Sequence, residues 1–356
     1  MKNVVIAWCN TNEKDFENFV PLKFVGERNL KLSFSNDINI LFFNGFNNLS
    51  QQYKSDLQNL GYSLFDVSDL YNFFDKKYSE LNRFGNYEKK CFLRWPVLEK
   101  FFQNEQVIHY DGDIIFNEDP LVIAKKLKGK TFVLQGCPAF TCISNIDWFS
   151  QYNEELNLFV KDIENYSDKA WRDRFGWEIT FKTRWAGSRF RKIITSDQDF
   201  ISHLIHSEKI IQDKIEDILL ALNDYICFEN PLFVHSYDEN FSYKYIRENG
   251  IDYFSYKRED AKNYFIKKRV LFWHMQSCFN FYLSKAIFRK KFLSFLPMGK
   301  LKFNLAAKGL EDFVNKKAGK FLNHNSRLNV YKYFFEKHDF SGVFNKRIWW
   351  KEGIFD

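Results

Sequence analysis

Short apolar runs near the start of the chain predict buried strands. They cover residues 4–9, 38–43 and 62–67, and the second and third are bounded by Asn44-Gly45 and Gly61. Unbroken apolar runs of this length, bounded by turn residues, are typical of strands that are covered on both faces. Residues 50–60, between the second and third runs, have the apolar spacing of a helix.

The same alternation continues along the chain. Residues 94–102 have helical spacing, and apolar segments at 106–108, 114–116, 131–135 and 270–273 predict further strands, the last ending at His274. Ser196 is a good N-cap for a helix that begins at residue 197. Strands alternating with helices predict an α/β sandwich with a largely parallel sheet. From about residue 290 the chain is basic and helical in pattern, so we expect a domain at 1–290 and an extension at 291–356.

The composition adds a marked excess of aromatic residues. Phe, Tyr and Trp number 42, 18 and 9, or 19% of the 356 residues. Rings in this number either line a binding surface or reflect an AT-rich codon bias. The six cysteines include no C-x-x-C pair, which favours a reduced, cytoplasmic setting. The first residues lack the apolar core of a signal peptide, and no apolar run is long enough to span a membrane.

Charge is distributed unevenly along the chain. Residues 257–356 hold 22 Lys and Arg against 8 Asp and Glu, whereas residues 1–256 hold 30 against 37. The basic end also contains aromatic clusters such as 288–292 and 345–351. This composition is typical of a solvated helical face, of a segment that docks at an anionic membrane surface, or of a nucleic-acid contact. Of the two partners we expect the inner membrane surface, bound peripherally, rather than nucleic acid.

The sharpest chemical feature is the segment Asp111-Gly112-Asp113, which lies between two apolar runs. The glycine permits a tight turn, and the spacing brings both carboxylates toward one point at a strand end. Hard oxygen ligands of this kind suit Mg²⁺ or Mn²⁺, which also take phosphate oxygens. The alternative is a plain turn, because Asp-Gly is a common turn dipeptide.

The segment VIHYDGDIIF, residues 107–116, resembles the D-x-D motif of nucleotide-sugar glycosyltransferases of the GT-A fold. Three other segments resemble parts of the glycogenin-like family eight within that fold: the basic helix at 94–98, the D-Q-D helix start at 197–199, and the late strand that ends in His274. The resemblance covers about residues 1–285. It departs from family eight at Ser277, where the family has glycine, and no Lys-Pro-Trp follows. The resemblance therefore implies a GT-A enzyme of unspecified family.

The resemblance implies a mixed, Rossmann-like sheet flanked by helices and a set of site residues. Asp111, Asp113 and His274 would hold the metal, although His274 also fits a buried core histidine. Asp197 and Asp199 would contact the acceptor as catalytic residues, or would only cap their helix. The candidates for donor binding are Ala7, Asn10, Arg94, Asp111 and Lys285.

The function expected from these residues is a metal-dependent glycosyltransferase. It would move a sugar from a nucleotide-diphosphate donor, with a uridine-diphosphate sugar expected, to a glycan or lipid-linked acceptor such as a lipopolysaccharide or capsule precursor. A divalent ion would stabilise the departing diphosphate. The alternatives are a noncatalytic carbohydrate- or nucleic-acid-binding protein and a sugar-nucleotide nucleotidyltransferase. Residues 10–25 contain no glycine, which argues against the latter, and no hydrolase, kinase or nicotinamide-binding motif occurs.

Overall fold

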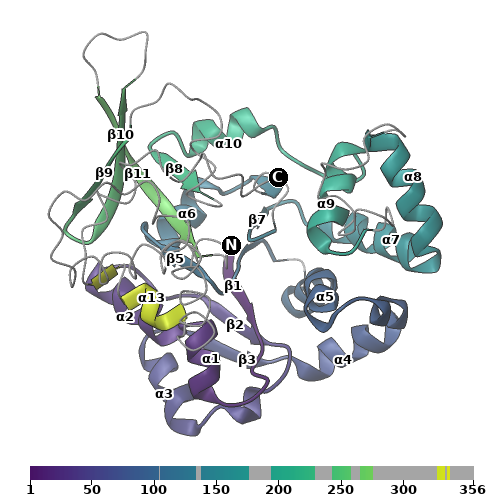
Figure 1. Ribbon diagram of the computed structural model, residues 1–356, viewed down its shortest axis with the longest axis horizontal. Helices are drawn as coiled ribbons and strands as arrows, with labels where there is room; N and C mark the ends of the chain where they lie inside the picture. The colour runs from purple at the N-terminus through teal and green to yellow at the C-terminus, as the bar shows by residue number, and fades with distance from the viewer. Residues whose placement is uncertain are drawn as a thin grey trace, which may run out of the picture.

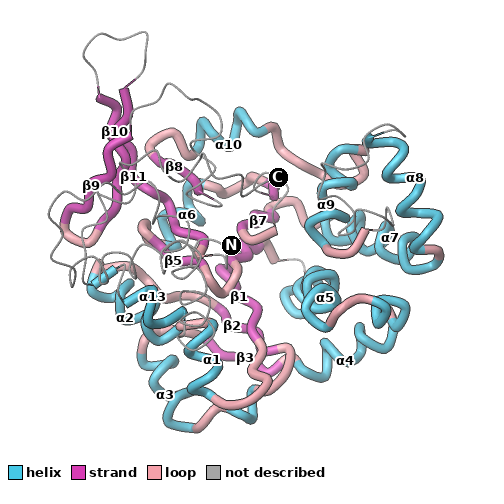
Figure 2. Tube along the Cα trace, viewed as in Figure 1, coloured by secondary structure: helices cyan, strands magenta, loops and turns pink. Residues whose placement is uncertain are grey.

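The computed structural model describes residues 1–103, 105–133, 138–175, 194–228, 243–257, 265–275, 327–332 and 335–336. Several strands lie in the middle of the molecule with helices around them, whereas a pair of strands projects at the upper left (Figures 1 and 2). The strands are β1 (Lys2–Ala7), β2 (Asn39–Phe42), β3 (Ser63–Asp66), β4 (Val107–Tyr110), β5 (Ile114–Phe116), β6 (Thr131–Val133), β7 (Phe140–Ile143), β8 (Tyr225–Phe228), β9 (Tyr243–Glu248), β10 (Ile251–Lys257) and β11 (Phe265–His274). The helices are α1 (Glu13–Phe19), α2 (Leu22–Lys31), α3 (Gln51–Asn59), α4 (Ser68–Lys77), α5 (Asn86–Phe102), α6 (Pro120–Lys126), α7 (Asp147–Lys161), α8 (Ile163–Phe175), α9 (Asp197–His206), α10 (Ile215–Ala221) and α13 (Arg327–Lys332).

Six strands form the main sheet in the order β3-β2-β1-β4-β7-β6. Strands β1 to β4 are parallel, whereas β7 runs antiparallel to both β4 and β6. The chain first builds the sheet outward from β1 to β3 and then returns to place β4 on the other side of β1. The carboxyl ends of β1 and β4 therefore meet at a topological switch point, where open α/β sheets bind ligands.

The two faces of this sheet carry separate hydrophobic cores. On β1, Val5 and Ala7 pack with residues of α1, α2, α3 and α6, whereas Val4 and Ile6 pack with residues of α4, α5, α7 and α9. The alternation follows from the two-residue period of a strand. Helices therefore cover both faces, which explains why the strands are apolar at nearly every position.

A second sheet lies beside the first and has the order β5-β11-β10-β9, with β8 pairing in parallel to β11. Strand β5 pairs antiparallel with the end of β11, so that Ile114 is opposite His274. Because β4 belongs to the main sheet and β5 to the second, the three residues that join them cross from one sheet to the other.

The observed elements confirm the predicted mixed α/β class, with a mixed sheet in place of a largely parallel one. The helix predicted at 94–102 begins earlier, at Asn86, and Pro96 lies inside α5 without ending it. Of the predicted extension 291–356, the structure describes α13 and residues 335–336, and there Tyr331 is fully buried against Phe24 of α2. The basic clusters at 288–292 and 345–351 lie outside the described residues.

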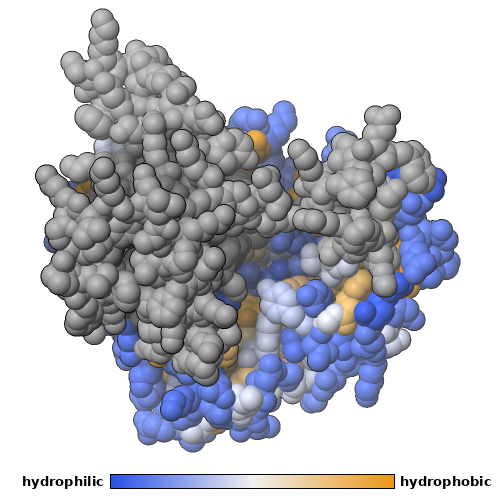
Figure 3. Space-filling view, in the orientation of Figure 1, coloured by the Kyte–Doolittle hydropathy of each residue, from blue (hydrophilic) through white to orange (hydrophobic). Residues whose placement is uncertain are grey.

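The described surface on the face shown in Figure 3 is mainly hydrophilic along its lower edge, with small apolar patches. This is the pattern of helices that turn one side to water. Within the part of the chain that the structure describes, no helix has the length and apolar character needed to cross a bilayer.

Candidate metal and ligand site

The turn Asp111-Gly112-Asp113 is fixed by backbone hydrogen bonds to both sheets. The Asp111 amide donates to the Ala139 carbonyl at 2.8 Å, beside β7, and the Met275 amide donates to the Asp113 carbonyl at 2.9 Å, beside β11. Gly112 is needed at the turn for space, since a Cβ there would lie 2.8 Å from Cγ1 of Val20. The two carboxylates are therefore held on a rigid connection rather than on a free loop.

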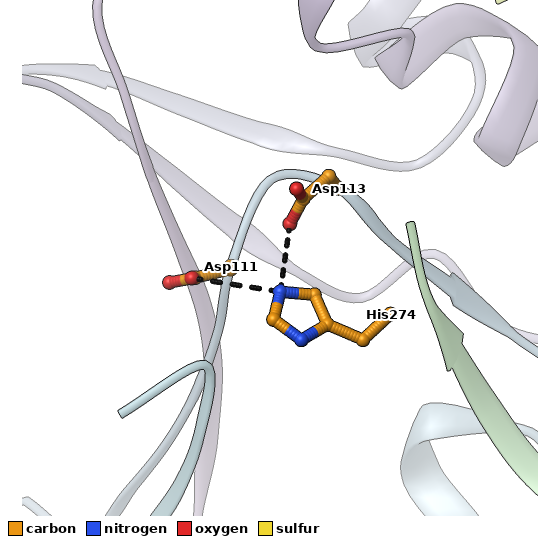
Figure 4. Close-up of side chains that lie close together, drawn as sticks. All are labelled: Asp111, Asp113 and His274. Atoms are coloured by element: carbon orange, nitrogen blue, oxygen red, sulfur yellow. Dashed lines mark ion pairs between the residues drawn. The ribbon is translucent and has the colours of Figure 1, made fainter. Parts of the chain in front are cut away.

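Figure 4 shows the two carboxylates and the His274 ring converging on one point. The Nε2 atom of His274 lies 3.2 Å from Oδ1 of Asp113 and 3.9 Å from Oδ2 of Asp111. One ligand atom from each of the three residues can be chosen so that all lie within 4.8 Å of one another. Two ligands at about 2.1 Å from an ion can be no more than about 4.2 Å apart. A small adjustment of the carboxylates would satisfy this limit, so the residues fit a divalent metal.

The kind of donor atoms restricts which metal would bind. Two carboxylates and one imidazole combine hard oxygen ligands with a nitrogen ligand, a set that suits Mn²⁺ better than Mg²⁺. His274 is 3% exposed and its backbone is held in β11. The side chain is thus presented to the carboxylates by strand pairing, as expected of a ligand supplied by a strand end.

Asp113 is also paired with a basic residue from a distant part of the chain. Nη1 of Arg327, at the start of α13, lies 3.2 Å from Oδ2 of Asp113. Burial raises the pKa of the Asp113 carboxyl, but His274 and Arg327 outweigh burial and lower the pKa to about 2. Asp113 is therefore ionised at neutral pH, which is the form that binds a cation.

Arg94 connects Asp111 with the start of α9. Its Nη1 donates to Oδ1 of Asp111 at 2.7 Å, while Nε and Nη2 lie 2.8 and 2.6 Å from Oδ2 of Asp197. Trp95 donates its indole N–H to the same oxygen of Asp197 at 3.1 Å. Arg94 and Asp197 are 7% and 2% exposed, so this is a buried, multiply bonded ion pair.

Asp111 and Asp113 line a pocket at the switch point of the main sheet. Its walls come from the carboxyl ends of β1 and β4, from one face of α5, and from α13; the lining residues are Ile6, Ala7, Trp8, Val20, Tyr87, Lys90, Cys91, Arg94, His109, Asp111, Gly112, Asp113 and Arg327. Burial and the nearby Arg94 lower the pKa of His109 to about 3, so this ring is neutral. The charged lining groups are then three cations and two carboxylates.

The structure brings some of the predicted site residues together and places others elsewhere. Ala7 and Arg94 line the pocket with Asp111 and Asp113, whereas Asn10 is exposed and is not part of the lining. Asp197 lies behind Arg94 and is buried. Lys285 lies outside the described residues.

Asp199 faces its own helix start. Its amide donates to Oγ of Ser196 at 3.3 Å, and its carboxylate accepts from the amide and hydroxyl of Thr195, each at 3.4 Å. Burial raises the pKa of Asp199 to about 6. Asp199 is not among the pocket-lining residues, so its geometry fits helix capping, while Ser196 caps α9 as predicted.

Sequence reasoning missed several residues of the pocket. Trp8, Tyr87, Lys90 and Arg327 line it, and only Lys90 carried a usable signal. It precedes Arg94 by four positions, so the two share a helix face. Nothing in the sequence near Arg327 connects it with the acidic turn more than two hundred residues earlier.

Comparison with known protein families found no family model that matches the chain, and no curated protein matches its sequence. The fold and the site define a mixed α/β protein with a cluster of two aspartates and a histidine beside the carboxyl end of β4 in its main sheet.

Proposed function

We propose that the protein is a metal-dependent glycosyltransferase of the GT-A fold that uses a nucleotide-diphosphate sugar. The observation that carries the proposal is the convergence of Asp111, Asp113 and His274, with both carboxylates lining a pocket at the carboxyl ends of β1 and β4. Carboxylates at this edge suit a divalent ion that also takes phosphate oxygens. The D-x-D turn at the end of the fourth strand and the late histidine agree with that fold.

In the proposed reaction, the bond between the anomeric carbon of the sugar and the diphosphate oxygen breaks. The oxygen of an acceptor hydroxyl forms the new bond to that carbon and gives up its proton, which passes to the departing diphosphate or to water. A divalent ion held at this site would stabilise the negative charge that develops on the departing diphosphate. The residue roles follow from the geometry: Asp113 and His274, which lie 3.2 Å apart, would hold the cation, and Arg94 orients Asp111 through a hydrogen bond of 2.7 Å.

The charge of the pocket supports an anionic donor. Lys90, Arg94 and Arg327 supply positive charge around the two carboxylates, and a divalent ion would add to it. A diphosphate has the charge that such a site attracts. A uridine-diphosphate sugar as donor, a glycan or lipid-linked acceptor, and peripheral contact with a membrane through the basic end of the chain complete the proposal.

The test measures release of nucleotide diphosphate from a panel of nucleotide sugars, with and without Mn²⁺. We expect turnover that requires the metal. Asp113→Asn should lower the turnover rate at least about a hundredfold, which is the size of effect seen when a group that stabilises transition-state charge is removed. Asp37→Asn is the matched control, because Asp37 is an exposed carboxylate far from the pocket lining. If no nucleotide sugar turns over and Mn²⁺ does not change the melting temperature, the proposal fails and a noncatalytic binding protein is favoured.

A further inference from the structure

Lys90 occupies an unusual position for a lysine. It lies on α5 one turn before Arg94, lines the same pocket, and is only 7% exposed. Lysines are almost never buried to this degree unless they are paired. The position of its ammonium group is therefore informative about what the pocket binds.

The ammonium group of Lys90 faces an aromatic ring. Its Nζ atom lies 5.1 Å from the ring centroid of Trp8, the residue that follows β1. Among the residues that the structure describes, no carboxylate lies within ion-pair distance of this nitrogen. Burial and the neighbouring charge of Lys89 lower the pKa of Lys90, and they outweigh the attraction of Asp75, which is not in contact with this ammonium group.

The next lysine along the helix provides the contrast. Nζ of Lys89 lies 2.7 Å from Oδ1 of Asp75 and donates to Oδ1 of Asn82 at 2.8 Å. Lys89 is 8% exposed, almost as buried as Lys90, but its charge is fully paired within the protein. Two adjacent, similarly buried lysines thus differ in one respect: Lys89 contacts a carboxylate of the fold, and Lys90 lines the pocket beside Trp8 without such a contact.

We propose that Lys90 binds an anionic oxygen of the ligand that enters this pocket, and thereby selects for a ligand with negative charge next to Trp8. This inference rests on the proposed function for the identity of the ligand, a nucleotide-diphosphate sugar. The anionic oxygen belongs either to the diphosphate or to the carboxylate of a sugar acid. Both have the same chemistry toward an ammonium group, a charge-assisted hydrogen bond that the Trp8 ring does not supply.

The experiment measures binding by calorimetry in the presence of Mn²⁺ for four ligands: inorganic pyrophosphate, uridine diphosphate, and uridine-diphosphate glucose and glucuronate. Lys90→Met and Lys90→Gln remove the charge, Lys90→Arg keeps it, and Lys89→Met is the matched control. Melting temperatures identify any variant that does not fold. We expect Lys90→Met and Lys90→Gln to weaken binding of the phosphate ligands at least about tenfold and to reduce its salt dependence, whereas Lys90→Arg and Lys89→Met stay within about threefold of the wild type.

The four ligands distinguish the sources of the anion and the two proposals. A loss of affinity for pyrophosphate and uridine diphosphate assigns Lys90 to the diphosphate; a loss seen with the glucuronate donor and not with the glucose donor assigns it to a sugar carboxylate. Lys90-dependent binding of pyrophosphate without binding of any nucleotide supports the anion site and contradicts the proposed donor. Equal affinities of wild type, Lys90→Met and Lys90→Gln for all four ligands, or no binding by the wild type, would overturn the inference.

Discussion

Arg94 and Asp197 form a buried ion pair that joins two sides of the candidate site. Three contacts of 2.6 to 3.1 Å reach the same Oδ2 atom of Asp197, two of them from Arg94 and one from the Trp95 indole. The remaining nitrogen of the guanidinium group contacts Asp111. The start of α9 and the end of β4 are thus connected through one side chain, and Asp197 serves as a structural anchor for Arg94.

Removing Arg94 should therefore destabilise the whole protein. Arg94→Met leaves Asp197 buried without its cation, and breaking a buried pair from one side costs about 3–5 kcal/mol. Urea unfolding monitored by circular dichroism measures this loss. The double variant Arg94→Met, Asp197→Asn should lose less than the sum of the two single variants, because the unpaired charge is then absent. A loss below about 1 kcal/mol in Arg94→Met would show that the pair does not stabilise the fold in this way.

The local sequence predicted the elements that carry the site but not most of their contacts. The apolar run at 106–108 and the acids at 111 and 113 are adjacent in the chain, so the position of the acidic turn after a strand follows from pattern alone. The contact of His274 with that turn depends on the pairing of β11 with β5. Such non-local pairing has no signature in either segment, and only the resemblance to a known fold predicted it.

The contact made by Asp197 is another that its local sequence did not predict. Its position at the start of an apolar helix predicted an acceptor contact or a capping role, and Ser196 caps that helix as predicted. The partner of Asp197, Arg94, is 103 residues away. Burial of a charge pair is a tertiary property, so the role of Asp197 as the anchor of Arg94 could not be derived from its neighbours in sequence.

Arg327 should compete with a cation for Asp113. Its guanidinium group lies 3.2 Å from the carboxylate, so a divalent ion entering the site meets a positive charge that already neutralises one ligand. We expect Arg327→Met to bind Mn²⁺ about threefold to tenfold more tightly than the wild type in the absence of nucleotide, a change of the size produced by one partly screened charge. Titration followed by Mn²⁺ electron paramagnetic resonance gives the affinity.

Lys332, an exposed residue at the other end of α13, is the control for this measurement. Lys332→Met removes a charge from the same helix without touching the site and should leave the Mn²⁺ affinity unchanged. Weaker Mn²⁺ binding in Arg327→Met would instead mean that the arginine holds Asp113 in its ligating position.

Gly112 should be required because of Val20. A Cβ at position 112 would lie 2.8 Å from a Val20 methyl group, and a β-branched side chain has little rotamer freedom with which to yield. We expect Gly112→Ala to lower stability by about 1–3 kcal/mol, as overpacking does, and to weaken Mn²⁺ binding by displacing the carboxylates. The added variant Val20→Ala opens the space and should restore the metal affinity. Failure of Val20→Ala to restore it would contradict the steric explanation.

Glu17 should make stability depend on pH. Its carboxylate accepts hydrogen bonds from the Tyr53 hydroxyl and from the amides of Lys23 and Phe24, at the start of α2. Burial nevertheless raises the pKa of Glu17 from 4.5 to about 7. The folded protein then holds this proton more tightly than the unfolded chain, so the free energy of unfolding falls as pH rises from about 4.5 to about 7.

The variant Glu17→Gln keeps an acceptor oxygen and removes the titrating group. A pKa shift of this size corresponds to about 3 kcal/mol of unfolding free energy. Between pH 5 and pH 8 the wild type should lose this stabilisation and the variant should not. The variant should therefore gain about 2–3 kcal/mol relative to the wild type over that range. Urea unfolding at several pH values measures it. Glu13→Gln is the control, because a hydrogen bond from Ser50 lowers the pKa of Glu13. Glu13 is therefore fully ionised above pH 5, and replacing it cannot change how the unfolding free energy depends on pH in that range. Parallel pH profiles for Glu17→Gln and the wild type would show that Glu17 titrates as an ordinary surface carboxylate.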